Sequence, residues 1–225
     1  MIIEPIAYFR SSFPAKFGIP RQSGIVDELC GSIVFTPQDR NADALRGIEG
    51  FDYLWLVWEF SANKSSADKW YPTVRPPLLG GNRAVGVFAT RSPFRPNRLG
   101  LSSVRMESID YDSPDAPVIH VRGADIMDGT PIYDIKPYVA YTDAHPNARS
   151  GFVDANKWQT LTVNMPQHIS ESVPAHLLPA LMKVLALDPR PQYHDDEDKV
   201  YGLFFGGMNV RFKVSGSVLD VIEVI

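Results

Sequence analysis

The sequence predicts a mainly β protein built around an antiparallel sheet, and three observations lead to that prediction. Segments rich in β-branched and aromatic residues recur at regular spacing through the first ~140 residues, with little helical periodicity between them. The 225 residues include 19 Pro and 16 Gly, which favours short elements joined by turns. No G-x-G-x-x-G motif lies between a strand and a helix, and strands do not alternate with helices. We therefore expect a closed or sandwiched antiparallel sheet and not a Rossmann fold.

The first 60 residues contain three predicted strands and one short helix. Ile2–Arg10 and Gly31–Phe35 have the composition of strands, and the basic loop Arg10–Ile25 joins them. Asn41–Gly47 predicts a short helix, with an Asn as N-cap and a Gly as terminator. Phe51–Phe60 is almost wholly apolar, so we expect a strand whose two faces are both covered.

The middle of the chain alternates strands with turn-rich loops. The loop Arg91–Gly100 is stiffened by two prolines, and Asp128-Gly129 predicts a turn. The strands expected here are Ala84–Thr90, Leu101–Tyr111, Val118–Ala124 and Pro131–Tyr141.

The C-terminal third has a different character. His145–Gly151 is typical of a linker, and Pro166–Asp188 has helical spacing that Pro174 and Pro179 should break or restart. Two hairpins are expected after residue 199, one around Gly206-Gly207 and one after Gly216. We divide the chain into a first domain at residues 1–145 and a small second domain at residues 146–225.

Basic and acidic residues are segregated along the chain. The net charge is −4, yet the stretch from Lys69 to Met106 contains seven basic residues and no Asp or Glu. That stretch carries +7 and the remainder −11, and HDDED at residues 194–198 is an acidic cluster. The seven are Lys69, Arg75, Arg83, Arg91, Arg95, Arg98 and Arg105. Six of them are Arg, which suits forked recognition of phosphate, so we expect a polyanionic partner.

Several classes of protein are excluded by the same sequence. One cysteine, Cys30, rules out an internal disulfide or a thiolate-rich zinc site, and the scattered histidines predict no metal site. No apolar run approaches the ~20 residues that span a bilayer, and the N-terminus lacks signal-peptide character. We therefore expect a cytoplasmic protein that uses neither a metal nor a membrane.

Two polar clusters are candidates for function. Three arginines project from the stiffened loop Arg91–Gly100, which suits recognition of an anion by preorganised groups. The second cluster places Asp128, Thr130, Tyr133, Asp134 and Lys136 within nine residues. Asp125 and Asp128 are three residues apart, which differs from the D-x-D-G-T pattern of acid phosphatases, and a simple turn also explains Asp-Gly.

Several long motifs, in order and covering nearly the whole chain, resemble the TrmO (YaeB, TsaA-like) family. They are PRQSGI (residues 20–25), TVRPPLLGGN (73–82), GVFATRSPFRPNRLGLS (86–102), DGTPIYDIKPY (128–138) and DPRPQY…YGLFFGGMNVRF (188–212). The resemblance implies a single antiparallel β-barrel followed by a small α+β C-terminal domain. It also implies an S-adenosylmethionine-dependent tRNA methyltransferase, a homodimer, that methylates N6 of N6-threonylcarbamoyladenosine at position 37, beside the anticodon.

The resemblance also implies which residues bind the cofactor. Ser61 and Ala62 stand where family members carry His-Gln. The full set carried over by motif is Ser23, Gly24, Ile25, Ser61, Ala62, Arg91, Leu101, Gly129, Thr130, Pro131 and Ile132.

We assign the remaining candidate roles by chemistry. The carbamoylated N6 is a poor nucleophile, so Asp128, Asp134 or Tyr133 would take its proton or polarise its N–H. Arg91 would face the cofactor, and the basic residues expected to contact the tRNA anticodon loop are Arg21, Arg75, Arg95, Arg98 and Lys136. Two other classes stay open, namely a non-catalytic RNA-binding β-barrel and a small-molecule hydrolase built around Asp128.

Overall fold

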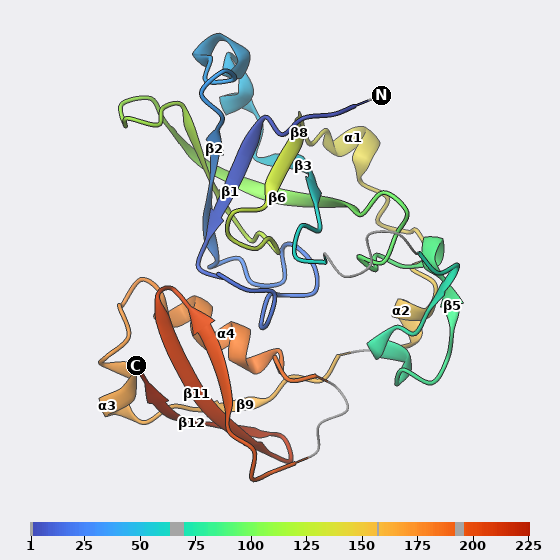
Figure 1. Ribbon diagram of the computed structural model, residues 1–225, viewed down its shortest axis with the longest axis vertical. Coiled ribbons are helices and arrows are strands. Elements are labelled where there is room, and N and C mark those ends of the chain that lie inside the picture. The colour runs from blue at the N-terminus through green and yellow to red at the C-terminus, as the bar shows by residue number, and fades with distance from the viewer. Residues whose placement is uncertain (1, 64–69, 157, 192–195) are drawn as a thin grey trace.

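A computed structural model shows two separate β-sheets and a projecting arm (Figure 1). It describes residues 2–63, 70–156, 158–191 and 196–225. Lys69, which is one of the seven basic residues, and the first two residues of the HDDED cluster lie outside the described residues. The predicted architecture, a mainly β protein with an antiparallel barrel and a small α+β C-terminal part, is confirmed.

Six strands form a closed barrel in the order β1-β2-β7-β6-β3-β8, and every pairing in it is antiparallel. The strands are β1 (Ala7–Ser11), β2 (Cys30–Phe35), β3 (Tyr53–Glu59), β6 (Leu99–Asp110), β7 (Val118–Arg122) and β8 (Pro131–Pro137). Closure leaves the sheet without an unpaired edge.

Alternate residues of each barrel strand fill its interior. On β3, Leu54, Leu56 and Trp58 are buried, whereas Tyr53 points outward and is 43% exposed. The prediction that both faces of this strand are covered therefore holds fully for the inner face only, because the barrel encloses that face. On the outer face Tyr53 is exposed, and Trp55 and Val57 are half-buried. The outer face carries aromatic residues and a valine before Glu59, so composition alone concealed the alternation.

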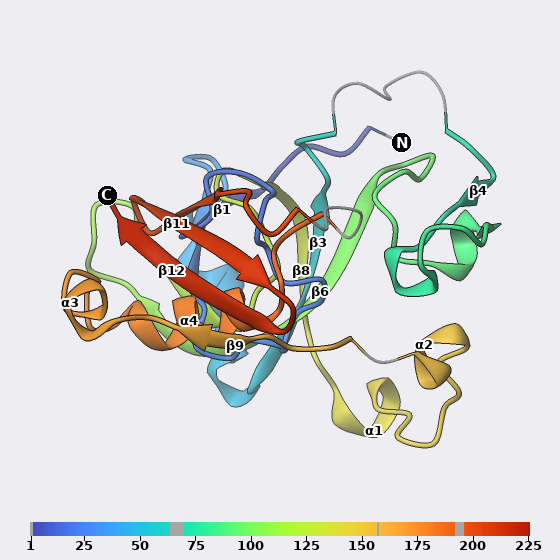
Figure 2. The same ribbon diagram turned by 90° about the horizontal axis from the view of Figure 1, so that it is seen from below.

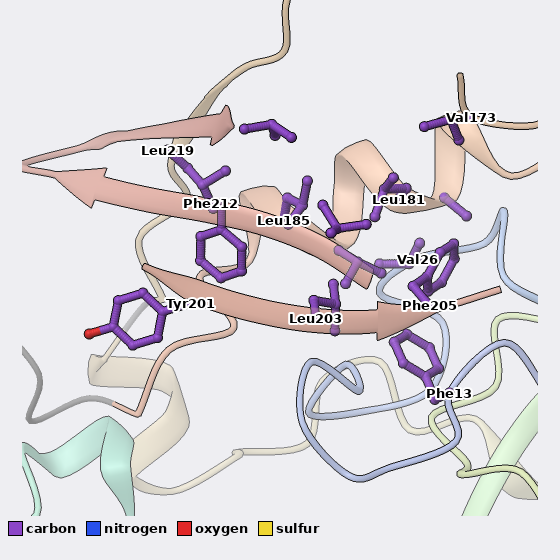
Figure 3. Close-up of a cluster of buried hydrophobic side chains, with 14 of the residues drawn as sticks. Phe13, Val26, Val173, Leu181, Leu185, Tyr201, Leu203, Phe205, Phe212 and Leu219 are labelled. Atoms are coloured by element: carbon purple, nitrogen blue, oxygen red, sulfur yellow. The ribbon is translucent and has the colours of Figure 1, made fainter. Parts of the chain in front are cut away.

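The second sheet has four strands in the order β10-β11-β12-β9, and helices pack against it (Figure 3). Its strands are β9 (Thr162–Asn164), β10 (Tyr201–Phe205), β11 (Met208–Ser215) and β12 (Val218–Val224). Both predicted hairpins are confirmed, but β9 was not predicted, because it is short and pairs in parallel with the distant β12. The core of this part includes Phe13, Val26 and Leu29 from the loop between β1 and β2. That loop joins the two parts, and the division at residue 145 stays a prediction.

Helical segments are few and short. They are α1 (Ala140–Asp143), α2 (Phe152–Ala155), α3 (Gln167–Ser170) and α4 (Leu178–Ala186). Pro179 lies in the first turn of α4, where a missing N–H costs nothing, so it starts that helix and does not interrupt it. Asn41 caps a short 3-10 helix at Ala42–Leu45 by accepting from the Asp43 N–H, as the sequence predicted.

An arm of residues 70–98 extends from the barrel to one side (Figure 2). It contains a two-stranded ribbon, β4 (Thr73–Val74) and β5 (Val85–Gly86), and only Val87 among its residues is buried. The strand predicted at Ala84–Thr90 is only these two residues of β5 followed by a 3-10 turn. Within the part of the chain that the structure describes, no helix has the length and apolar character needed to cross a membrane.

Candidate functional site

Three chain connections meet at one end of the barrel, which we call the site end. Because the strands are antiparallel, the segments 12–29, 60–98 and 123–130 all leave and re-enter the barrel there. Every residue expected to bind the cofactor lies in one of these connections or in the first residues of the strand that follows. The same end faces the C-terminal sheet (Figure 1), and the Gly206 N–H donates to Ser12 C=O across that junction.

The first and third connections touch through their backbones. The Gly24 N–H donates to Gly123 C=O at 2.8 Å, and a Cβ added at Gly123 would lie 3.4 Å from Gly24 Cα. Gly24 has φ +78° and Gly129 has φ +71°, which glycine adopts without strain. Apart from the glycine itself and its two neighbours in the chain, no heavy atom of the described residues lies within 4 Å of where a Cβ would stand at either position. Both turns therefore present bare backbone to open space, so a ligand can approach closely.

Asp128 and Gly129 form the predicted turn, but it is not a hairpin turn. β7 pairs with β2 and β6, and β8 pairs with β1 and β3, so the strands on either side of the turn are not neighbours. The Asp128 carboxylate accepts the Ser11 N–H at 3.1 Å and lies 3.8 Å from the Arg10 guanidinium. The turn is thus fastened to the end of β1, which places Gly129 and Thr130 beside it.

Asp125 is the most buried carboxylate of the third connection and was not among the predicted site residues. The Ser102 hydroxyl donates to Asp125 Oδ1 at 2.6 Å, and the Trp58 indole N–H donates to Ser102 Oγ at 3.0 Å. Burial raises the pKa of Asp125 above its usual range. Hydrogen bonds from Ser102 and from the Ser23 N–H, with the positive charge of Arg91, act in the opposite direction.

Tyr133 and Asp134 lie at the start of β8 and have different partners. The Tyr133 hydroxyl donates to Glu59 Oε2 at 2.7 Å. Burial and this hydrogen bond raise the pKa of Tyr133 to about 12. Asp134 accepts from the Ile135 N–H and lies 2.9 Å from Lys136 Nζ. The structure therefore does not bring the three candidate catalytic groups into one hydrogen-bonded cluster.

The three arginines of the loop Arg91–Gly100 bind different parts of the molecule. Arg91 donates to Gln22 Oε1, which ties the arm to the PRQSGI loop. Arg95 donates to Thr90 C=O at 2.7 Å, and Arg98 donates to Asn63 C=O at 3.1 Å. Arg91 thus reaches the PRQSGI loop, whereas Arg98 holds the segment next to the predicted cofactor residues Ser61 and Ala62.

The other predicted RNA contacts are scattered over the molecule. Arg75 is exposed on the arm, but Lys136 lies on the barrel wall beside Asp134. The Arg21 guanidinium stacks 3.5 Å from the Trp158 ring centroid and donates to Leu187 C=O, and burial lowers its pKa. Arg21 therefore packs against the C-terminal part, and its guanidinium is largely engaged there.

Large aromatic side chains are exposed on the arm among its arginines. Trp70 is 48% exposed and Phe88 is 71% exposed, with ring centroids 6.0 Å apart, and Tyr71 and Phe94 are exposed as well. The Arg95 guanidinium lies 5.9 Å from the Phe88 ring centroid. Exposed aromatics interleaved with arginine form a surface on which unstacked bases can stack.

The remaining cofactor candidates complete the rim of the site end. Ser61 and Ala62 lie just beyond the end of β3, after Phe60. Leu101 and Ile25 expose apolar side chains to 57% and 44%. A nucleoside with an amino-acid tail needs an apolar surface for its base, backbone donors and a cation for its carboxylate. Leu101 and Ile25, the glycine turns and Arg91 provide these, so the residues present fit S-adenosylmethionine. In the part of the chain that the structure describes, no three His, Cys, Asp or Glu side chains gather as a metal site would require.

Sequence reasoning missed four polar residues of the site end, namely Gln22, Glu59, Ser102 and Asp125. The sequence contained a feature that could have pointed to three of them. Gln22 and Ser102 lie inside motifs of the resemblance, and Asp125 is three residues before Asp128. Glu59 is the one acid in the apolar second half of its strand. Their partnership could not be predicted, because the partners come from different strands and connections of the barrel.

Comparison with known proteins agrees with this geometry. A model of the tRNA-methyltransferase O N-terminal domain matches residues 8–144, and a model of the TrmO C-terminal domain matches residues 157–225. The chain is 34% identical over 226 residues to a "tRNA (adenine(37)-N6)-methyltransferase" of Escherichia coli, covering 97% of this chain and 95% of that protein. It is 36% identical to a "Putative S-adenosylmethionine-dependent methyltransferase RcsF" of Pseudomonas aeruginosa, covering 93% and 91%.

Solved structures lead to the same group. The crystal structure of TrmO from Pseudomonas aeruginosa superposes with a TM-score of 0.80 at 29% sequence identity, and the match covers 100% of this chain and 98% of that one. Both parts of the molecule therefore have counterparts in one family. The chain belongs to the tRNA-methyltransferase O (TrmO) family.

Proposed function

We propose that this protein is an S-adenosylmethionine-dependent tRNA methyltransferase that methylates N6 of the adenosine at position 37. The observation that carries the proposal is the convergence of every motif-derived cofactor residue at one end of the barrel. Near-full-length similarity to a tRNA (adenine(37)-N6)-methyltransferase supports it. We further propose that the base is N6-threonylcarbamoyladenosine, as the family resemblance implies.

The chain's own residues bind and orient the methyl donor, which supplies an activated methyl group on a sulfonium. The bare backbone at Gly24 and Gly129 lets the donor approach, and Leu101 and Ile25 give its base an apolar surface. The Arg91 guanidinium suits its carboxylate. Fixing both reactants in line is the main contribution that such a site can make.

The transfer is an in-line displacement. The N6 lone pair forms the new N–C bond, the C–S bond breaks with its electron pair staying on sulfur, and N6 loses a proton. At neutral pH Tyr133, with its pKa near 12, is a donor of a hydrogen bond and not an acceptor of this proton. We propose Asp128 or Asp134 as the acceptor. If the Asp128→Asn variant binds the cofactor normally and its turnover is undiminished, Asp128 is not the proton acceptor.

We propose that the arm binds the anticodon loop. Among its described residues 70–98 there is no Asp or Glu, and its exposed aromatics are suited to unstacked bases. Arg95 and Arg98 are proposed to contact phosphates with the N–H groups that do not hold the arm together. The target base has to leave its stack to reach the site end.

The decisive experiment measures transfer of labelled methyl to tRNA that carries or lacks the threonylcarbamoyl group. We expect transfer only to the modified tRNA. Calorimetry with S-adenosylmethionine separates this function from the alternative, a non-catalytic RNA-binding barrel, which would bind tRNA and not the donor. A hydrolase built around Asp128 would ignore the donor, and the attachment of Asp128 to Ser11 and Arg10 gives no support to a nucleophilic role.

We also propose a homodimer that acts in the cytoplasm. The family resemblance and the proposed tRNA substrate support these two statements. Light scattering of the purified protein tests the first, and the location of a tagged protein in its cells tests the second. A monomeric mass at micromolar concentration would contradict the dimer.

A further inference from the structure

A chain of three hydrogen-bonded side chains runs from inside the barrel to the site end. Trp58 donates to Ser102 at 3.0 Å, and Ser102 donates to Asp125 at 2.6 Å. Trp58 is 6% exposed and Ser102 is 2% exposed, so the barrel interior fixes both. The Asp125 carboxylate at the outer end is therefore held in one orientation by a preorganised support.

Asp125 is also the point at which the three connections of the site end meet. Ser23, in the first connection, directs its backbone N–H to the Asp125 carboxylate, and Arg91, in the second, attracts it electrostatically. Asp125 itself belongs to the third. Arg91 donates in turn to Gln22 next to Ser23, so these residues form a network in which Arg91 acts on Asp125 through its charge and not through a direct hydrogen bond.

The network has no evident benefit for stability. Burial raises the pKa of Asp125, so keeping it ionised at neutral pH costs folding free energy. A charge retained in spite of such a cost is more typical of a functional site than of a structural one. The positive charge that stabilises the ionised form of Asp125 is that of Arg91, the one cation among the predicted cofactor residues.

We propose that Asp125 is a positioning residue of the cofactor site. Its carboxylate attracts the Arg91 guanidinium and so favours the arrangement in which Arg91 binds the carboxylate end of the methyl donor. It acts through Arg91 and does not touch the reacting atoms. This inference rests on the proposed function.

The test uses Asp125→Asn, which keeps the size of the side chain and an acceptor for Ser102 but removes the charge. We expect the Kd for S-adenosylmethionine, measured by calorimetry, to rise about tenfold or more, as the loss of a charged partner predicts. The Kd for S-adenosylhomocysteine should rise by the same factor, because both molecules carry the carboxylate. Turnover at saturating donor should change little. The control is Asp112→Asn, the same change on an exposed turn, which should alter none of these values.

Two further measurements distinguish an effect on folding from an effect on the cofactor site. The Tm of Asp125→Asn should equal or exceed that of the wild type, because the ionisation cost is removed. Ser102→Ala, which removes one support of the carboxylate, should weaken donor binding in the same direction by a smaller factor. If either variant binds both ligands as the wild type does, Asp125 is not a positioning residue.

A double-mutant cycle with Arg91→Ala tests whether Asp125 acts on donor binding through Arg91. We expect Asp125→Asn to add no further loss of affinity once Arg91 is absent. Additive losses would overturn the proposal, as would a loss confined to S-adenosylmethionine, which would mean that Asp125 meets the sulfonium directly. Failure of the wild type itself to bind the donor would instead overturn the proposed function, and this inference with it.

Discussion

The barrel and the arm are built on opposite principles. The barrel encloses a core of fully buried residues such as Ile33, Leu54 and Ile119, and its closed sheet pairs every strand twice. The arm has one buried side chain, Val87, and a ribbon of two residue pairs. Its large apolar side chains face outward among arginines. The barrel therefore supplies the stability, and the arm has a surface whose composition serves binding and not folding.

The largest expected effect is a loss of stability from a change inside the barrel. Ile119→Ala removes a side chain with 0% exposure and should lower the free energy of unfolding by about 2–5 kcal/mol. Phe88→Ala removes a larger side chain from the arm but should change the free energy of unfolding by about 0.5 kcal/mol or less. Urea denaturation measures both. Equal losses would show that the arm is part of the folding core.

The next effect is on RNA binding and should appear in the arm alone. Trp70→Ala or Phe88→Ala should each weaken tRNA binding by about 1–3 kcal/mol, the usual contribution of a base stacked on an aromatic ring. Phe204→Ala is the control, because Phe204 is 57% exposed but lies on β10 of the C-terminal sheet. Filter binding measures the three Kd values. An unchanged Kd for both arm variants contradicts the stacking surface.

A smaller effect concerns the charge of the arm. Arg75→Ala should reduce the slope of log K against log salt by about 0.7–0.9, the change expected for one lost phosphate contact. Arg149→Ala, an exposed arginine outside the arm, should leave the slope unchanged. Titrations at several salt concentrations give the slopes. If both variants change the slope equally, the positive charge acts through the whole molecule and not through the arm.

The smallest effect is a pH dependence in the wall of the barrel. The folded-state pKa of Tyr133, about 12, lies above the ordinary value of 10.0, so the folded state favours the protonated phenol. Its contribution to stability is complete below pH 10 and is lost as the pH rises towards 12. Tyr133→Phe should therefore show a shallower loss of stability in that window. Denaturation at pH 9 and pH 11 measures the difference, and parallel losses in both proteins would contradict the assignment.

Local pattern and composition determined much of this protein. The order of the barrel strands along the chain, the two C-terminal hairpins, the Asn41 cap and the segregated charge all follow from neighbouring residues. The motifs of the resemblance identified the family and most of the residues that now line the site end. Such features depend on periods of two or on turn residues, which a sequence displays directly.

Only the tertiary structure decided which residues meet. Barrel closure buries one face of β3 fully and the other only in part, which its apolar composition did not reveal. The turn at Asp128 joins strands that are not neighbours, and β9 pairs with a strand more than 50 residues later. Asp125, Ser102, Ser23 and Arg91 come together because three antiparallel connections share one end of the barrel. The sequence separation of such partners is set by topology, and no local period records it.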